Sequence, residues 1–167
     1  LCLAPEVFGK VVLCATAAEI DPRLGCICDG LRGQLDAGVP DDVLTRSLLP
    51  YLFSPRFLLR PSTLPMLLAL FAARRPANHA LRGQLTALRA HDLGTRLGDG
   101  LRTAGARVAI IQGGDDMLIA APTQERLADV CGVTPRVLAG LGHCLWLEDP
   151  DGLVGAIAAA LREECGA

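Results

Sequence analysis

Two polar turns carry residue types that could do acid–base chemistry. Gly113-Gly114-Asp115-Asp116 follows a short apolar run, and Gly140-Leu141-Gly142-His143 follows a second one. A histidine acting as general base, with a carboxylate that fixes its tautomer, forms the second half of a nucleophilic triad. Either Asp115 or Asp116 could supply that carboxylate. Asp and Gly are also ordinary turn residues, so Asp115 and Asp116 could belong to a simple turn. A lone His in a turn is more often a solvated or hydrogen-bonded side chain than a catalyst.

Short apolar runs indicate the strands that must position these turns. Buried strands are expected at 10–15, 107–111 and 134–139, with helices at 122–131 and from 149 to about 164. Strand–helix alternation predicts parallel βαβ units and therefore an α/β fold. Ligands of such sheets bind at the carboxyl ends of the strands, which is where both polar turns fall.

A helical region separates the first strand from the second. Residues 1–8 indicate the end of a helix, and helical periodicity then runs, with breaks, from Asp21 to about His91. About four helices are expected, starting near residues 21, 41, 62 and 77, with 51–57 as an aromatic-bearing connector. The absence of a strand pattern between them indicates an α-helical insert.

Composition limits the classes of function. The chain has 167 residues, is 51% hydrophobic and carries a net charge of −2, which argues against a nucleic-acid or anionic-membrane surface. The longest apolar run, 67–73, is too short to cross a bilayer, and no signal-peptide pattern is found. Because the chain opens with Leu1, we expect the numbering to begin inside a longer product.

Cysteine usage favours a reducing compartment, and hence a cytoplasmic location. Seven cysteines at irregular spacing make a poor disulfide framework. Cys26-Ile27-Cys28 is the only tight pair, and no second half of a zinc site accompanies it. We therefore expect no metal site.

Residues 108–116 and 140–150 resemble the C-terminal part of the α/β-hydrolase fold family. That family carries its acid in a Gly-x-x-Asp turn after strand seven, matching Gly113 to Asp116. Its histidine lies in a Gly-His turn after strand eight, followed by Glu-x-Pro, matching 142–150. Residues 11–18 resemble strand six, and 91–97 resemble the return from the helical cap. The strand-six stretch and the cap are most like 3-oxoadipate enol-lactonases and related carboxylic ester hydrolases.

The resemblance implies an α/β chain holding parallel strands six to eight, their flanking helices and an α-helical cap. Its parts would be 1–19, with strand six and the end of the preceding helix; 20–100, the cap; and 101–167, with strands seven and eight. It implies His143 as the general base, Asp116 as its acid in preference to Asp115, and no cofactor. Glu148 would start a helix or support the site.

The resemblance also suggests side chains that could contact a small-molecule ester or lactone substrate. They are apolar or aromatic, and ordinary core packing is the alternative for each. These candidates are Trp146, Met117, Leu118, Phe53 and Phe57.

The sequence departs from the family at the nucleophile. The family's serine lies in a Gly-x-Ser-x-Gly elbow that precedes the acid, and neither Ser47, Ser54, Ser62 nor the segment 25–29 supplies one. We expect the elbow and the first five strands to lie outside these residues, which leaves this chain alone without esterase activity.

Three functions remain open at this stage. The intact protein could hydrolyse an ester or lactone through an acyl-enzyme. It could instead be a non-catalytic, truncated hydrolase that acts as a binding module, or it could use the fold for acyl transfer or dehalogenation. Without a neighbouring fifth strand, strand 10–15 would expose an apolar edge suited to association.

Overall fold

A three-stranded parallel sheet forms the centre of the chain. The computed structural model describes residues 9–74, 76–104 and 107–162, so the expected helix end at 1–8 lies outside the described residues. The strands are β1 (Lys10–Cys14), β2 (Arg107–Gly113) and β3 (Arg136–Leu138), in the order β1-β2-β3. Both pairings are parallel. This confirms the predicted parallel α/β arrangement, although β2 is longer and β3 shorter than expected.

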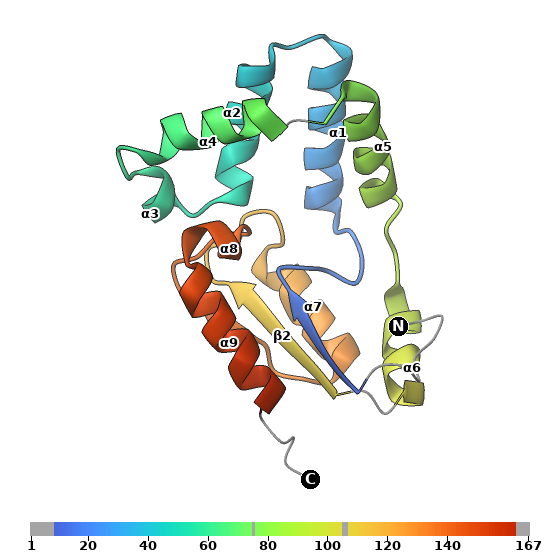
Figure 1. Ribbon diagram of the computed structural model, residues 1–167. Helices are drawn as coiled ribbons and strands as arrows, with labels where there is room; N and C mark the ends of the chain where they lie inside the picture. Colours follow the sequence, from blue (N-terminus) through green and yellow to red (C-terminus); the bar gives the residue numbers. More distant parts are fainter. Residues whose placement is uncertain (1–8, 75, 105–106, 163–167) are drawn as a thin grey trace.

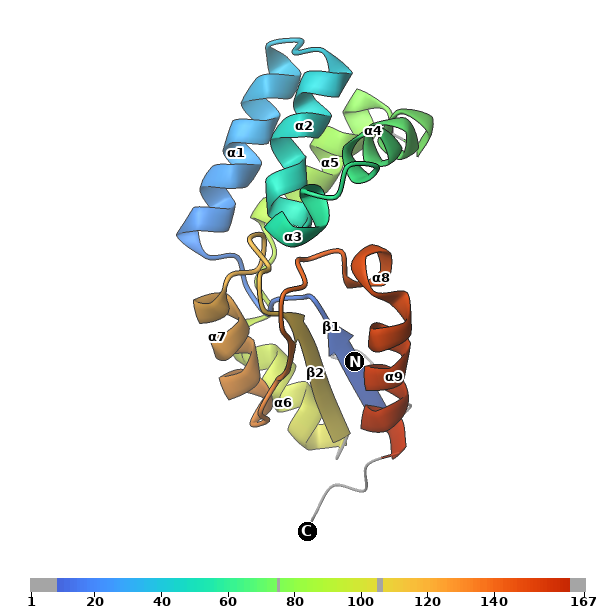
Figure 2. The same cartoon turned by 90° about the vertical axis from the view of Figure 1, so that its left-hand side faces the viewer.

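Helices cover both faces of this sheet (Figures 1 and 2). On one face lie α6 (Gly94–Ala104) and α7 (Ala121–Cys131), and on the other lie α8 (Leu145–Glu148) and α9 (Pro150–Arg162). Successive residues of β2 point to opposite faces. Accordingly, Ile110 packs in the cluster of α6 and α7, and Ile111 packs with Leu145 and Leu153.

Five helices form a separate layer beyond the carboxyl ends of β1 and β2 (Figure 1). We call this layer the helical insert; its members are α1 (Pro22–Asp36), α2 (Asp41–Leu52), α3 (Pro55–Leu58), α4 (Thr63–Arg74) and α5 (Asn78–Arg89). Leu24 and Leu31 of α1 pack with Leu44 of α2 and Leu85 of α5. The short helix α3 lies within the stretch expected to be a connector. It forms because Ser54 caps its first turn and a proline occupies the first helical position.

The insert leaves and rejoins the core at adjacent points. Glu19 and Asp92 form an antiparallel bridge, and the Leu93 amide donates to the carbonyl of Ala18 at 2.8 Å. Beyond this point α6 packs on the sheet, since its Leu97 lies in the same cluster as Ile110. The start of α6, assigned above to the cap, therefore packs with the core. None of the described helices is both long and apolar enough to cross a membrane.

Candidate active site

The turn at residues 113–116, here called the acid turn, fixes the carboxylate of Asp116 at the end of β2. The backbone amides of Leu118 and Ile119 each donate to its Oδ1 at 2.8 Å. Gln124 of α7 supports the turn by donating to the carbonyl of Ile119 at 2.6 Å. The Asp116 side chain is fully buried. Its second oxygen, Oδ2, faces the turn at residues 140–143, here called the histidine turn.

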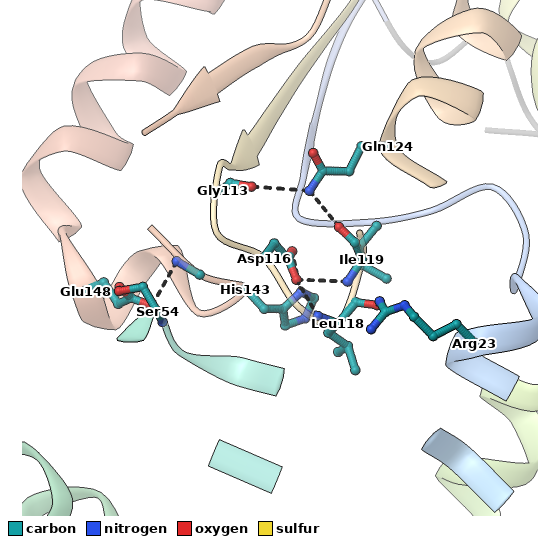
Figure 3. Close-up of polar contacts among 10 residues, drawn as sticks. Arg23, Ser54, Gly113, Asp116, Leu118, Ile119, Gln124, His143 and Glu148 are labelled. Atoms are coloured by element: carbon teal, nitrogen blue, oxygen red, sulfur yellow. Dashed lines mark hydrogen bonds and ion pairs between the residues drawn. The ribbon is translucent and has the colours of Figure 1, made fainter. Parts of the chain in front are cut away.

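His143 lies against that oxygen, as Figure 3 shows. Its Nδ1 is 3.0 Å from Oδ2 of Asp116. An ionised carboxylate only accepts hydrogen bonds, so Nδ1 carries the proton and Nε2 of the neutral ring holds a lone pair. The imidazole is 17% exposed, and within the described part of the chain Nε2 has no hydrogen-bond partner. This arrangement can accept a proton at Nε2 and stabilise the resulting imidazolium.

Asp115, the alternative acid, takes a different place. Its side chain is exposed, and its backbone amide donates to the carbonyl of Leu141 at 2.9 Å. It therefore helps to join the acid turn to the histidine turn through its backbone. Of the two candidate acids, the structure brings only Asp116 to His143.

Two glycines allow the acid and histidine turns to meet. A Cβ on Gly113 would overlap the carbonyl oxygens of Leu141 and Gly142. A Cβ on Gly142 would lie 2.5 Å from the amide nitrogen of Ser54 and 2.7 Å from Oε1 of Glu148. Real Cβ atoms do not approach other atoms so closely. The Gly-rich motifs of the sequence therefore mark backbone-to-backbone contact.

Glu148, on α8, joins the histidine turn to the helical insert. Its Oε1 accepts from the amides of Gly142, at 3.0 Å, and Ser54, at 2.8 Å. Its Oε2 accepts from the hydroxyl of Ser54. From the sequence, Glu148 was expected to start a helix or to support the site, and Ser54 was not expected in the site. The two residues are 94 positions apart, so no local spacing could have indicated their contact.

The acid turn also contacts the insert. Arg23 of α1 donates from Nη2 to the carbonyl of Leu118 at 2.8 Å. Asp21, the N-cap of α1, accepts from the hydroxyl of Thr123 on α7. Partial burial acts to raise the pKa of Asp21, but hydrogen bonds from Thr123 and Leu24 outweigh it and lower that pKa. Both turns of the site are thus bonded to the insert.

Possible nucleophiles near the histidine are occupied or protonated. The hydroxyl of Ser54 is committed to Glu148, and that of Ser47 bonds within the insert. Burial, followed by the negative charges of Glu148 and Asp116, raises the pKa of Cys144 to about 12. Cys144 is therefore a thiol at neutral pH. In residues 9–74, 76–104 and 107–162, no serine or cysteine side chain hydrogen-bonds to His143.

The suggested substrate contacts fall into two groups. Trp146 is 54% exposed and lines an apolar cavity of about 420 Å³ with Leu48 and Phe71 of the insert. Phe53 and Phe57, in contrast, are buried and stacked on each other with ring centroids 5.5 Å apart.

The two candidates after the acid turn also differ from each other. Met117 is half exposed, and Leu118 packs partly buried against the insert's core. Among the residues that the structure describes, no group of three or more His, Cys, Asp or Glu could hold a metal ion.

Comparison with known proteins identifies relatives of this arrangement. A model of the Alpha/beta hydrolase family matches residues 2–156. A search of curated proteins finds no significant match. The solved structure of Rv0554 from Mycobacterium tuberculosis aligns over 96% of this chain and 58% of its own, with 23% identity and a TM-score of 0.79.

Two further structures carry enzymatic descriptions. An enol-lactonase from Burkholderia xenovorans LB400 aligns over 93% of this chain and 56% of its own, with 21% identity and a TM-score of 0.72. A thermophilic esterase from Thermogutta terrifontis aligns over 92% and 55%, with 18% identity and a TM-score of 0.67. At these identities the likeness concerns the fold. The chain spans a little over half the length of these proteins.

Proposed function

Since the chain belongs to the alpha/beta hydrolase family, we propose that it carries the acid–histidine half of a catalytic triad that hydrolyses a small ester or lactone. The observation that carries this proposal is the 3.0 Å contact between Nδ1 of His143 and the buried Asp116 carboxylate. It lies at the carboxyl ends of adjacent parallel strands, where ligands of such sheets bind. The enol-lactonase and the esterase among the similar structures favour this substrate class.

The proposed reaction passes through an acyl-enzyme. A serine hydroxyl from outside these residues attacks the substrate carbonyl while Nε2 of His143 takes its proton. His143 then protonates the leaving oxygen as its bond to the acyl carbon breaks. Water attacks the acyl-enzyme in the same way, which releases the acid and restores the serine. Asp116 holds the imidazole orientation throughout and stabilises its charged form.

We propose that the helical insert is the cap of this enzyme. On that assignment the cap runs from residue 20 to about Leu93, because α6 packs with the core. The apolar cavity beside Trp146 would receive an apolar part of the substrate. The cysteines within the described residues are all free thiols, which supports a reducing, cytoplasmic setting.

The experiment that tests the proposal is ester hydrolysis by the intact protein. We expect His143→Ala, and Asp116→Asn, to lower kcat/KM by several orders of magnitude, as removal of a triad member does. An asparagine amide would donate to Nδ1, which places the ring proton on Nε2 and removes the base.

Two exposed residues provide matched controls, and they leave the site intact. His79→Ala on α5 and Asp115→Asn in the acid turn should keep kcat/KM within about threefold of the parent. A His143→Ala enzyme within about tenfold of the parent would remove His143 from the mechanism. The 167-residue chain alone should not hydrolyse esters, and stoichiometric labelling of it by a serine-directed phosphonate would contradict this.

A second candidate function is suggested by the edge of the sheet. Among the described residues β1 pairs only with β2, and the backbone groups of Val12 and Cys14 on its other edge bond to no strand of that part of the chain. We propose that this edge associates with a strand of another segment or chain by strand addition. In a non-catalytic protein, that association would be the function itself.

A further inference from the structure

We propose that Glu148 is a positioning residue that couples the placement of the helical insert to the placement of His143. The consequence of this coupling for catalysis rests on the proposed function. The coupling itself depends only on contacts within this chain.

The Glu148 carboxylate is buried and its bonds are divided between two segments. It accepts from Gly142 in the histidine turn, and from both the amide and the hydroxyl of Ser54 in the insert. A buried carboxylate is costly unless donors surround it. Glu148 therefore stabilises the arrangement in which both segments present their donors together.

The two residues that flank His143 in the chain are both bonded at the contact between the histidine turn and the insert. The preceding residue, Gly142, bonds to Glu148, and the following residue, Cys144, donates from its amide to the carbonyl of Leu52 in α2 at 2.9 Å. The Cys144 side chain also packs in the insert's cluster with Phe53. A shift of the segment 52–54 therefore moves the backbone on both sides of the imidazole.

Close packing makes this coupling stiff. No room for a Cβ exists at Gly142, where Ser54 and Glu148 approach the backbone. The acid turn has its own bond to the insert: Arg23 donates to the carbonyl of Leu118, and the amide of Leu118 donates to Asp116. The insert thus holds both partners of the Asp116–His143 pair, and Glu148 provides the bond on the histidine side.

The test follows the His143–Asp116 hydrogen bond directly, by nuclear magnetic resonance of the Nδ1 proton in the intact protein. We expect Glu148→Ala to speed exchange of this proton and of the Gly142 amide about tenfold or more, the effect of removing a buried charged acceptor. Glu148→Gln retains an acceptor for the backbone amides and should stay within about threefold of the parent. Glu125→Ala, at an exposed carboxylate on α7, is the matched control and should change neither rate.

Ser54→Ala keeps the proposal testable if Glu148→Ala does not fold. It removes one donor from the insert and leaves Glu148 in place, so faster exchange at His143, 89 positions away in sequence, would show the coupling. A folded Glu148→Ala protein, or a Ser54→Ala protein, with parental exchange at Nδ1 would overturn the proposal.

Hydrolysis adds a separate readout. In an active enzyme, Ser54→Ala should lower kcat with little change in KM, because Ser54 holds the base and not the substrate. If the intact protein hydrolyses no ester, the proposed function fails, while the exchange measurements still decide whether Glu148 couples the insert to His143.

Discussion

At the scale of single residues, the surroundings of Cys144, next to the candidate base, strongly favour its neutral thiol form. Burial and the nearby carboxylates of Glu148 and Asp116 raise its pKa from 9.0 to about 12. The thiol is therefore an apolar packing group beside His143. We therefore do not expect Cys144 to act as a nucleophile, although it lies next to the candidate base.

The raised pKa of Cys144 predicts a loss of stability in alkali. The contribution of the protonated Cys144 thiol to the free energy of unfolding is fully present below pH 9. It is lost as the pH rises toward 12, because the unfolded chain releases the thiol proton while the folded chain keeps it. Above pH 9 the free energy of unfolding should fall more steeply in the parent than in Cys144→Ala, by up to about 1.4 kcal/mol per pH unit.

Urea unfolding between pH 7 and pH 10.5 measures this difference. Cys26→Ala, at an exposed cysteine of α1, is the control and should follow the parent curve. Parallel curves for the parent and Cys144→Ala would show that the thiol titrates alike in both states.

At the scale of elements, the contact between the histidine turn and the insert depends on a missing side chain. A methyl group at position 142 would lie 2.5 Å from the amide nitrogen of Ser54 and 2.7 Å from the carbonyl carbon of Phe53. Both are main-chain atoms. We expect Gly142→Ala to lower the free energy of unfolding by about 1–3 kcal/mol through overpacking. Denaturant unfolding of the purified variant measures this.

Gly155 on α9 is the matched control for that substitution. A Cβ there meets nothing within 4 Å. Gly155→Ala should raise the free energy of unfolding by about 0.5–1 kcal/mol, because alanine restricts the unfolded chain and favours the helix. Equal effects of the two substitutions would contradict the close approach at Gly142.

Elements with a strong local pattern were predictable from the sequence. The β-branched run of β2 and the repeated leucines of α1 each indicate one structure by periodicity. The helices α3 and α8 span four residues each, which is too short for a period to be seen. Helix α6 contains three glycines and is held by packing on the sheet, so helix propensity gives no signal for it.

The candidate site was predictable only in part, for a related reason. Asp116 and His143 follow successive strands of a parallel sheet, and this topology brings strand ends together. The bonds from Glu148 to Ser54 join segments 94 positions apart. Such a contact depends on how the insert packs against the core, and no sequence motif in either segment indicates that packing.

At the scale of the whole molecule, the edge of β1 that pairs with no strand among the described residues predicts association. The carbonyl of Gly9 accepts from Arg107 and the amide of Ala15 donates to Ile111, so alternate residues between them bond to β2. The amide of Val12 therefore points away from β2. Val12→Pro should weaken association without breaking the β1–β2 pairing, because proline is tolerated where the amide is unpaired.

Sedimentation of the chain over a range of concentrations measures the association. Val11→Pro, which removes an amide that bonds to β2, is the contrasting variant and should lower the stability of the fold itself. Unchanged association of a folded Val12→Pro chain would rule out strand addition at this edge.

The bridge between Glu19 and Asp92 brings the two ends of the helical insert together, and we expect the insert to be exchangeable for this reason. Its two ends are adjacent, so the strand order β1-β2-β3 and the Asp116–His143 pair can be built on a chain whose insert is replaced by another segment of different length. We expect such an exchange to change the segment that lies over the site and to retain the Asp116–His143 contact. The Glu148 bonds set the condition for such an exchange: a transplanted insert must bring its own donors to that carboxylate.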